Sequence, residues 1–472
     1  MSAGRLVFPA LRWRAESGFD HEAEAIAAAL AFGAGGFILF GGTADAVFAL
    51  TARLRREAGR PLLIAADLER GAGQQVAGLD ELPPPLALAS LGDSAVLRGA
   101  GVLTALEALS VGINWVLAPV ADLDIEPANP IVQTRSFGAD PGAAAEAVAS
   151  WIVGCEAGGA LACAKHFPGH GRTRSDSHDS VPIVGADARL MEETDLEPFR
   201  AAVSVGVSSI MTAHVAYPAL DPSGTPATFS APILALLREQ LGFRGLIVSD
   251  ALMMAGAQAY GSPAGTGLAA VRAGVDLLLY PNEPAEVAAA LDREAAADPA
   301  LRARVEAALE RYDAALGGAP VEDQPERLPP AGSSLAAADW LLSAPLLRGE
   351  APKLREPLEL VLVDDDQGGV WPASPNHFVA DALTARGIAL GPGGSKVVLA
   401  FAEPRASKGR AGFGAESRSA LASHAAAADL IALFAHPRLL AELPGAVPVL
   451  LAWHRQRLMQ EAAARWLAGR LA

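Results

Sequence analysis

The chain has 472 residues, of which 51% are hydrophobic, and its mean hydropathy is +0.27. These values exclude a disordered protein, and the length exceeds what one hydrophobic core usually supports, so two domains are expected. The net charge of -16 and the pI near 5.0 argue against nucleic acid or an anionic membrane surface as a partner. The two cysteines, Cys155 and Cys163, are too few for a disulfide framework and favour a reducing compartment.

The amino-terminal stretch predicts neither a secretory signal nor a membrane span. It lacks the basic start and the apolar core of a signal peptide. An uncharged run from Ala25 to Ala44 is long enough to raise the question of a membrane span. Three glycines, Gly33, Gly35 and Gly36, divide this run into a helix end and a buried strand, and such a break would leave backbone groups unpaired in lipid. A cytoplasmic protein with no membrane partner is therefore expected.

From the amino terminus to residue 280, short apolar runs alternate with Ala-, Leu- and Arg-rich segments of helical spacing. The expected strands are Leu6–Pro9, Gly36–Phe40, Pro61–Ala66, Asn114–Pro119, Leu161–Ala164, Ser209–Ala213, Leu246–Ser249 and Asp276–Tyr280. The expected helices between them include Glu22–Phe32, Ala44–Arg56, Ser94–Leu109, Pro141–Ala157, Leu196–Val205, Pro232–Leu241 and Pro263–Ala273. This alternation predicts an α/β protein with a parallel sheet, and roughly eight units is the count of a closed (β/α)8, or TIM-type, barrel.

Beyond the barrel the pattern changes. After Arg311 a Pro-, Gly- and charge-rich stretch has no apolar periodicity, which is typical of a linker. Further strands are expected at Leu358–Val363, Lys396–Ala402, Asp429–Phe434 and Val447–Trp453, and further helices near Phe378–Arg386, Glu416–Ala427 and Leu458–Leu471. The predicted organisation is a (β/α)8 barrel over residues 1–317, a linker over 318–332 and a smaller α/β domain over 333–472. This last domain lacks an obvious acidic loop that could reach the barrel. We therefore expect it to serve stability, dimerisation or substrate entry and not the chemical step.

Charged and histidine side chains come directly after several of the predicted strands. These residues are Asp67, Asp122, Asp124, Lys165, His166, His214 and Asp250. In a (β/α)8 barrel the carboxyl ends of the strands form the rim on which active sites are built. The sequence therefore predicts an active site at this rim.

Two charged segments are candidates for binding a ligand. Asp67 opens an Asp-Leu-Glu-Arg sequence that ends at Arg70, and Arg135 lies in the segment NPIVQTRSFG. These groups can hydrogen-bond vicinal hydroxyls, because hydrogen bonds to charged groups are the strongest, and this suits a polyhydroxylated ligand. Taken singly, each is equally well explained as half of a structural ion pair.

The most informative segment is KHFPGHG, from Lys165 to Gly171, which is followed by Asp176 and His178. An Asp beside a His can orient the imidazole ring and raise its basicity, as a proton-transfer catalyst requires. The alternative is a solvated loop whose charges have no function.

Asp250 ends the apolar run GLIVSD. If it faces the mouth of the barrel, its carboxylate can act as a nucleophile or an electrostatic stabiliser. Glycoside hydrolysis with retention needs one group that attacks the anomeric carbon and one that moves a proton, and His178 is the candidate for the proton. The alternative is that Asp250 caps the amino terminus of a helix.

A zinc site is the main alternative for the histidines His166, His170, His178 and His214. Pro168 and Gly169 prevent the single helical face that a His-x-x-x-His zinc site uses, so no metal is expected. The glycines at 71–73 and 391–394 lack the spacing of phosphate-binding loops, and no cofactor is expected.

Together these residues resemble family 3 glycoside hydrolases, specifically the β-N-acetylhexosaminidases of the NagZ type in their two-domain form. The resemblance rests on blocks in family order: APVADLD (118–124), NPIVQTRSFGADP (129–141), KHFPGHG (165–171), DSH (176–178), DLEPF (195–199), MTAHVAYPALD (211–221) and GFRGLIVSDALMM (242–254). The KHFPGHG block with the following Asp-x-His is the most specific. It distinguishes this branch from the β-glucosidases, whose acid/base is a carboxylate from the second domain.

The resemblance implies a (β/α)8 barrel followed by an α/β sandwich. It implies that Asp250 is the nucleophile, that His178 is the general acid/base and that Asp176 is the partner of His178. The implied sugar-binding residues are Asp67, Arg135, Lys165 and His166. The implied activity is that of a retaining exo-β-N-acetylglucosaminidase, which removes terminal β-GlcNAc from peptidoglycan-derived fragments, so a small carbohydrate is the expected partner.

Two departures from the family pattern bear on specificity. Where the family often has DQEGGRVQR, this chain has DLERGAGQQV, so Arg70 takes a glycine position and Gln75 an arginine position. Either Arg70 supplies the missing sugar contact or the specificity differs. Ala251 stands where many members have a second Asp, which should be tolerated. The alternatives are another exo-β-glycosidase, such as a β-glucosidase, and an inactive sugar-binding or scaffold protein.

Overall fold

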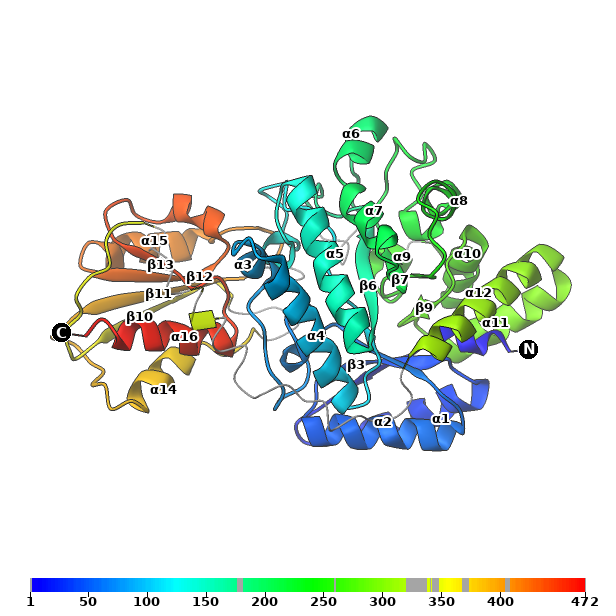
Figure 1. The fold of residues 1–472 in the computed structure, drawn as a ribbon, viewed down its shortest axis with the longest axis horizontal. Coiled ribbons are helices and arrows are strands. Elements are labelled where there is room, and N and C mark those ends of the chain that lie inside the picture. The colour runs from blue at the N-terminus through cyan, green and yellow to red at the C-terminus, as the bar shows by residue number, and fades with distance from the viewer. Residues whose placement is uncertain are drawn as a thin grey trace. The chain divides into compact units, whose positions relative to one another are not determined.

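The computed structural model describes residues 2–175, 181–258, 260–319, 338–339, 341, 348–366, 373–403 and 408–471. Their contacts group the chain into two compact units (Figure 1). The first unit comprises Met1–Asp80, Asp93–Ile125 and Ser136–Pro329. The second comprises Glu81–Gly92, Glu126–Arg135 and Pro330–Ala472, so two short segments from the first part of the chain group with its C-terminal part.

The first unit is built on a ring of parallel strands. Seven of them form one sheet, in the order β2 (Ala10–Arg12), β3 (Gly36–Phe40), β4 (Leu63–Ala66), β5 (Trp115–Val116), β6 (Leu161–Phe167), β7 (Ser209–Thr212) and β8 (Leu246–Val248). β1 (Val7–Phe8), which precedes β2 in the same segment, pairs in parallel with β9 (Leu278–Leu279). Leu277, next to β9, bridges Val248 of β8. The ring therefore closes, and the predicted TIM-type barrel is confirmed.

Helices follow the strands and surround the ring (Figure 1). They are α1 (Ala23–Phe32), α2 (Ala44–Ala58), α4 (Ser94–Ser110), α5 (Pro141–Gly158), α6 (Ala188–Glu193), α7 (Glu197–Ser204), α8 (Ala231–Ala235), α9 (Ala255–Gln258), α10 (Pro263–Ala273), α11 (Pro284–Ala297) and α12 (Pro299–Gly318). Local sequence explains where several of them begin, since the side chains of Thr43, Asp93 and Asp140 each accept a backbone N–H of the first turn. Among the described residues, no helix combines the length and the apolar character needed to cross a lipid bilayer.

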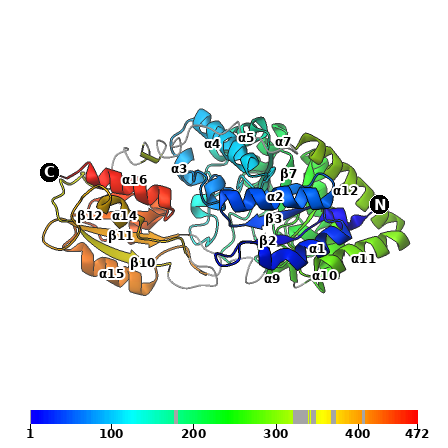
Figure 2. The ribbon, with the colours of Figure 1, turned by 90° about the horizontal axis from the view of Figure 1, so that it is seen from below.

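The second unit is a three-layer α/β sandwich, as predicted. Its parallel sheet has the order β10 (Glu359–Asp364), β11 (Lys396–Ala402), β12 (Leu430–Ala435) and β13 (Val449–Leu451). Alternate residues of β11 and β12 point to opposite faces and enter two separate core clusters. α14 (Phe378–Thr384) and α16 (Arg457–Ala468) cover one face, and α15 (Ala415–Ala425) covers the other (Figure 2). The short α3 (Pro85–Ala89) also belongs to this unit.

The structure corrects three boundaries. β6 extends to Phe167, so Lys165 and His166 lie in the strand and not after it, and they are only 2% and 7% exposed. The strand β2 was not predicted, and the helix α12 continues beyond Arg311 to Gly318. From residue 320 onward the predicted linker lies outside the described residues, and the predicted domain limits stay a prediction.

Glu107 of α4 fastens the loop that leaves β4. Its two carboxyl oxygens accept the N–H of Asp80 at 3.1 and 3.2 Å, and Gly73 donates its own N–H to the Asp80 carbonyl at 2.9 Å. Burial raises the pKa of Glu107 to about 7; the backbone hydrogen bond opposes this rise and the Asp80 carboxylate adds to it. Glu107 therefore holds a proton in the folded chain at pH values where the unfolded chain has lost it.

We predict that Glu107→Gln changes the pH dependence of stability. The raised pKa favours folding fully below pH 4.5, the ordinary pKa, and this contribution is lost as the pH rises through 7. Glutamine keeps an acceptor for the Asp80 N–H but does not titrate. The Tm of the variant should therefore rise relative to wild type between pH 5 and pH 8, measured by thermal unfolding. The exposed Glu239→Gln should run parallel to wild type, and parallel profiles for Glu107→Gln would contradict the assignment.

Candidate active site

The buried carboxylate of Asp122, after β5, organises the end of β6. Its Oδ1 accepts the backbone N–H groups of His166 at 3.1 Å and His170 at 2.7 Å, and its Oδ2 accepts the His166 Nδ1 proton at 2.7 Å. Burial alone would raise the pKa of Asp122, but the two histidines outweigh it and hold the pKa below its ordinary value. Because a carboxylate only accepts, Nδ1 of His166 carries a proton, and in the neutral tautomer of this ring Nε2 is then an acceptor.

Lys165 is held between two carboxylates that follow β4. Its Nζ lies 2.6 Å from Asp67 Oδ1 and 2.8 Å from Glu69 Oε1. The Lys165 side chain is 2% exposed, whereas that of Asp67 is 28% exposed and so remains open to a ligand. Glu69 was not among the predicted site residues. Its spacing of two from Asp67, which puts both side chains on one side of an extended segment, was the available signal.

Asp250 is half-buried after β8, and its Oδ1 accepts the N–H of Ala251 at 2.7 Å. Its charge acts on two side chains of the β6 segment. Burial lowers the pKa of His170 to about 4, and the carboxylates of Asp122 and Asp250 oppose this shift. Burial raises the pKa of Cys163 to about 12, and the carboxylates of Asp67 and Asp250 add to the shift while Lys165 opposes it. These couplings bring Asp250 into the same electrostatic neighbourhood as Asp67 and Lys165.

Asp250 does not cap a helix, because the next helix, α9, begins at Ala255. The peptide that follows Asp250 is held by His214, which is completely buried. His214 Nε2 donates to the Ala251 carbonyl at 3.2 Å, and its Nδ1 pairs with Thr228 Oγ1 at 2.8 Å. The sequence placed His214 at the predicted rim and offered it as an alternative zinc ligand, whereas in the structure it supports the Asp250 loop. Within the described residues, no group of three or more His, Cys, Asp or Glu side chains is arranged to hold a metal ion.

The β4 loop departs from the family pattern at Gln75 and Arg70, and both residues have defined contacts. Gln75, at the arginine position, uses its Oε1 to accept the N–H of Gly41 at 3.0 Å, just after β3. Arg70 is half-buried, and its backbone N–H donates to Gln74 Oε1 at 2.8 Å. Gln75 thus supports the backbone between β3 and the β4 loop, and Arg70 is the arginine that this loop contains.

The remaining predicted site residues are Asp176, His178 and Arg135. Asp176 and His178 lie outside the described residues, so the predicted acid/base pair stays a prediction. Arg135 belongs to the second unit, at the end of the short 3-10 helix Gln133–Arg135, where its Nη1 donates to the Ile131 carbonyl at 3.1 Å.

Comparison with known proteins identifies the family. Residues 22–313 match the Glycosyl hydrolase family 3 N terminal domain. A β-hexosaminidase from Nitrosomonas eutropha is 37% identical over 261 residues, which cover 53% of this chain and 74% of that protein. A β-N-acetylglucosaminidase/β-glucosidase from Cellulomonas fimi is 34% identical over 256 residues, 52% of this chain and 45% of that protein.

Similarity to a solved structure extends over both units. The structure of a glycoside hydrolase family 3 β-N-acetylglucosaminidase from Paenibacillus sp. str. FPU-7 is similar with a TM-score of 0.83 and 26% identity, and the match covers 100% of this chain and 96% of that one. The resemblance inferred from the sequence blocks is confirmed: the chain belongs to glycosyl hydrolase family 3 and is a glycoside hydrolase.

Proposed function

We propose that this enzyme is a retaining exo-β-N-acetylglucosaminidase that releases terminal β-GlcNAc from peptidoglycan-derived fragments in the cytoplasm. The observation that carries the proposal is the position of Asp250. A half-buried carboxylate follows β8, and because β4, β6 and β8 are parallel strands of one sheet, Asp250 lies at the same end of the barrel as Lys165 and Asp67. This is the arrangement that a nucleophile beside a hydroxyl-binding cluster requires. The names of the relatives from Nitrosomonas eutropha and Paenibacillus favour a hexosamine as the sugar.

We assign the hydroxyls of the terminal sugar to charged side chains. Lys165 pairs with both Asp67 and Glu69, and the 28% exposed carboxylate of Asp67 suits vicinal hydroxyls, since hydrogen bonds to charged groups are the strongest. His166 adds its Nε2, because its Nδ1 is committed to Asp122. Arg135 is assigned from the family pattern. Arg70 is proposed to replace the missing arginine, because Gln75 already accepts the N–H of Gly41.

The proposed reaction proceeds in two displacements. Asp250 attacks the anomeric carbon while His178, oriented by Asp176, gives a proton to the departing glycosidic oxygen, which forms a glycosyl ester and releases the aglycone. His178, now neutral, takes a proton from the incoming water, whose oxygen displaces Asp250 and regenerates the carboxylate. A neutral histidine suits this position because it adds no second negative charge beside Asp250.

The substrate panel that tests this function compares p-nitrophenyl β-GlcNAc, β-glucoside and β-xyloside. We expect the β-GlcNAc substrate to have the highest kcat/KM. Faster cleavage of the glucoside would instead select the β-glucosidase alternative, which the name of the Cellulomonas fimi relative includes. Binding of GlcNAc without turnover of any aryl glycoside would select an inactive sugar-binding protein.

The acid/base assignment predicts that two variants behave differently. His178→Ala should lose much more activity on a natural disaccharide than on an aryl glycoside, because p-nitrophenolate departs without a proton. General acid/base help of about 10²–10⁴-fold bounds the difference between the two losses. Asp250→Ala should be nearly inactive on both substrates, since no other group forms the glycosyl ester. The kinetics of both variants on both substrates provide the measurement.

Azide rescue supplies an independent readout. Azide needs no base, so it should partly restore turnover of the aryl substrate by His178→Ala and yield a β-glycosyl azide. The matched control is His377→Ala, because this side chain is 56% exposed in the second unit and has no proposed role. Equal losses on both substrates together with no response to azide would make His178 a structural residue.

A further inference from the structure

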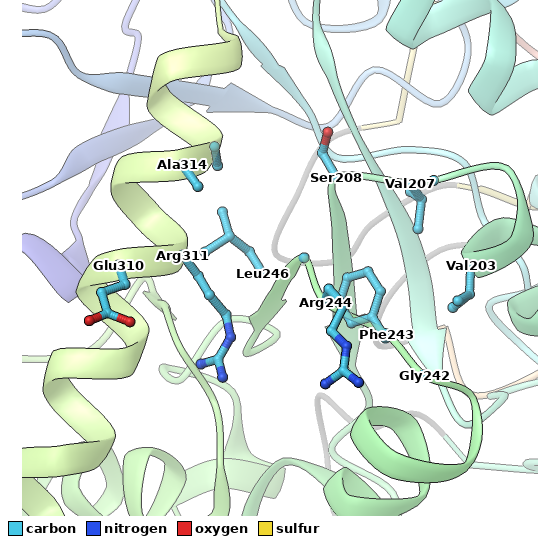
Figure 3. Close-up of a pocket in the computed structure, with 13 residues that line it drawn as sticks. Val203, Val207, Ser208, Gly242, Phe243, Arg244, Leu246, Glu310, Arg311 and Ala314 are labelled. Carbon is cyan, nitrogen blue, oxygen red and sulfur yellow. The ribbon is translucent and has the colours of Figure 1, made fainter.

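A second pocket lies in the barrel unit, at the end opposite to Asp250. It has a volume of about 570 Å³ and opens between α12 and the amino-terminal ends of β7 and β8 (Figure 3). Ser208 and Gly245, which directly precede these two strands, form part of its wall. Because a strand rises about 3.3 Å per residue, the five steps along the chain from Gly245 to Asp250 separate the pocket from the rim by about 16 Å. The pocket is thus separate from the proposed sugar site.

Arginines dominate the charge of this pocket. Arg244 and Arg311 line it, and Arg238 supports its wall by donating to the carbonyl groups of Phe243 and Gly245 at 3.2 and 2.6 Å. One buried carboxylate, that of Asp276, serves two of these guanidinium groups, since it pairs with Arg238 and lies 2.8 Å from Arg311 Nη1. Burial lowers the pKa of Arg238 to about 10, and the positive charges of Arg311 and Arg244 contribute to this shift against the attraction of Asp276.

Arg244 is the arginine of the pocket that does not pair with Asp276. It is exposed, and across the described part of the chain its side chain has no ion pair or hydrogen bond. Figure 3 shows the guanidinium groups of Arg244 and Arg311 directed to the same side of the pocket. Glu310, the acidic residue of the lining, lies on α12 on the side away from Arg244.

We propose that this pocket binds a small phosphate-bearing metabolite, whose phosphate is held by Arg244 and Arg311. Guanidinium groups match the geometry of phosphate oxygens and bind them through paired, charge-assisted hydrogen bonds. The volume falls within the range of small-molecule sites. The chain as a whole carries a net charge of -16, so the pocket is not simply part of a generally basic surface. Its arginines are a local exception on an acidic protein.

The test uses Arg244→Gln, because this exposed side chain can be neutralised without disturbing Asp276 and its two arginines. Binding of inorganic pyrophosphate is measured by isothermal titration calorimetry at constant ionic strength. Wild type should bind with one saturable site, and R244Q should bind about tenfold more weakly or worse, as expected for the loss of a charge-assisted contact. Arg56→Gln, which removes an exposed arginine of α2, should bind as wild type does.

Labelling locates the site. Phenylglyoxal should modify Arg244, as detected by peptide mass spectrometry, and pyrophosphate should protect it. The proposal is overturned if wild type shows no saturable binding, or if R244Q binds as tightly as wild type, which would place the anion elsewhere. Hydrolysis of the aryl glycoside by R244Q without pyrophosphate should equal that of wild type. Failure of all variants to hydrolyse it would therefore count against the proposed glycosidase function and not against this pocket.

Discussion

The carboxylate of Asp122 is the constraint on which the rim of the barrel depends. It lies where the chain leaves β5, and it accepts two backbone N–H groups and one imidazole proton from the His166–His170 segment. The neighbouring Ala121 N–H donates to the Lys165 carbonyl at 2.6 Å. The segment after β5 is therefore joined to the end of β6 both by this backbone hydrogen bond and by the Asp122 carboxylate. Hydrogen bonds to charged groups contribute about 1.5–3 kcal/mol each, which makes three of them on one buried oxygen pair a strong local constraint.

This constraint explains how adjacent residues serve different partners. β6 is irregular at this point, since its register with β7 shifts between Lys165 and Phe167. His166 turns to Asp122 from β5, whereas Lys165 turns to Asp67 and Glu69 from β4. The two loops that follow β4 and β5 are thereby fixed to the end of one strand. The rim is therefore preorganised by contacts within the protein, as the proposed site, which must stabilise a developing charge, requires.

Regular elements bounded by Gly or Pro were predictable from the sequence because their apolar period is local. Gly36–Phe40, Lys396–Ala402 and Pro263–Ala273 were each predicted with the bounds that the structure has. The end of β6 was not, because Lys165 and His166 are polar and read as loop residues. Their burial depends on partners 98 and 44 residues away in the chain, Asp67 and Asp122, and a window of local sequence contains no information about such partners.

The same limit applies to the candidate site. The sequence indicated four of the candidate residues because each follows or ends an apolar run: Asp67, Lys165, His166 and Asp250. The supporting contacts of Glu69 and His214 depend on which loops meet at the rim, and so they were missed or assigned another role. Gln75 illustrates the reverse case. Its departure from the family pattern was visible in the sequence, but its contact with the Gly41 N–H became visible only in the structure.

The charges at the rim bear on the proposed reaction. Among the described residues, the carboxylates of Asp67, Glu69, Asp122 and Asp250 all follow strands of the barrel, and Lys165 pairs with the first two, while burial keeps His170 neutral. In the proposed mechanism, carboxylates at the rim would stabilise the positive charge that develops at the anomeric carbon in an oxocarbenium-like transition state. They would also raise the pKa of one more carboxylate placed there as a general base, whereas a histidine titrates without adding negative charge. The proposed anion pocket at the other end of the barrel has the opposite balance of charge, because Arg238, Arg244 and Arg311 outnumber the two carboxylates of Asp276 and Glu310.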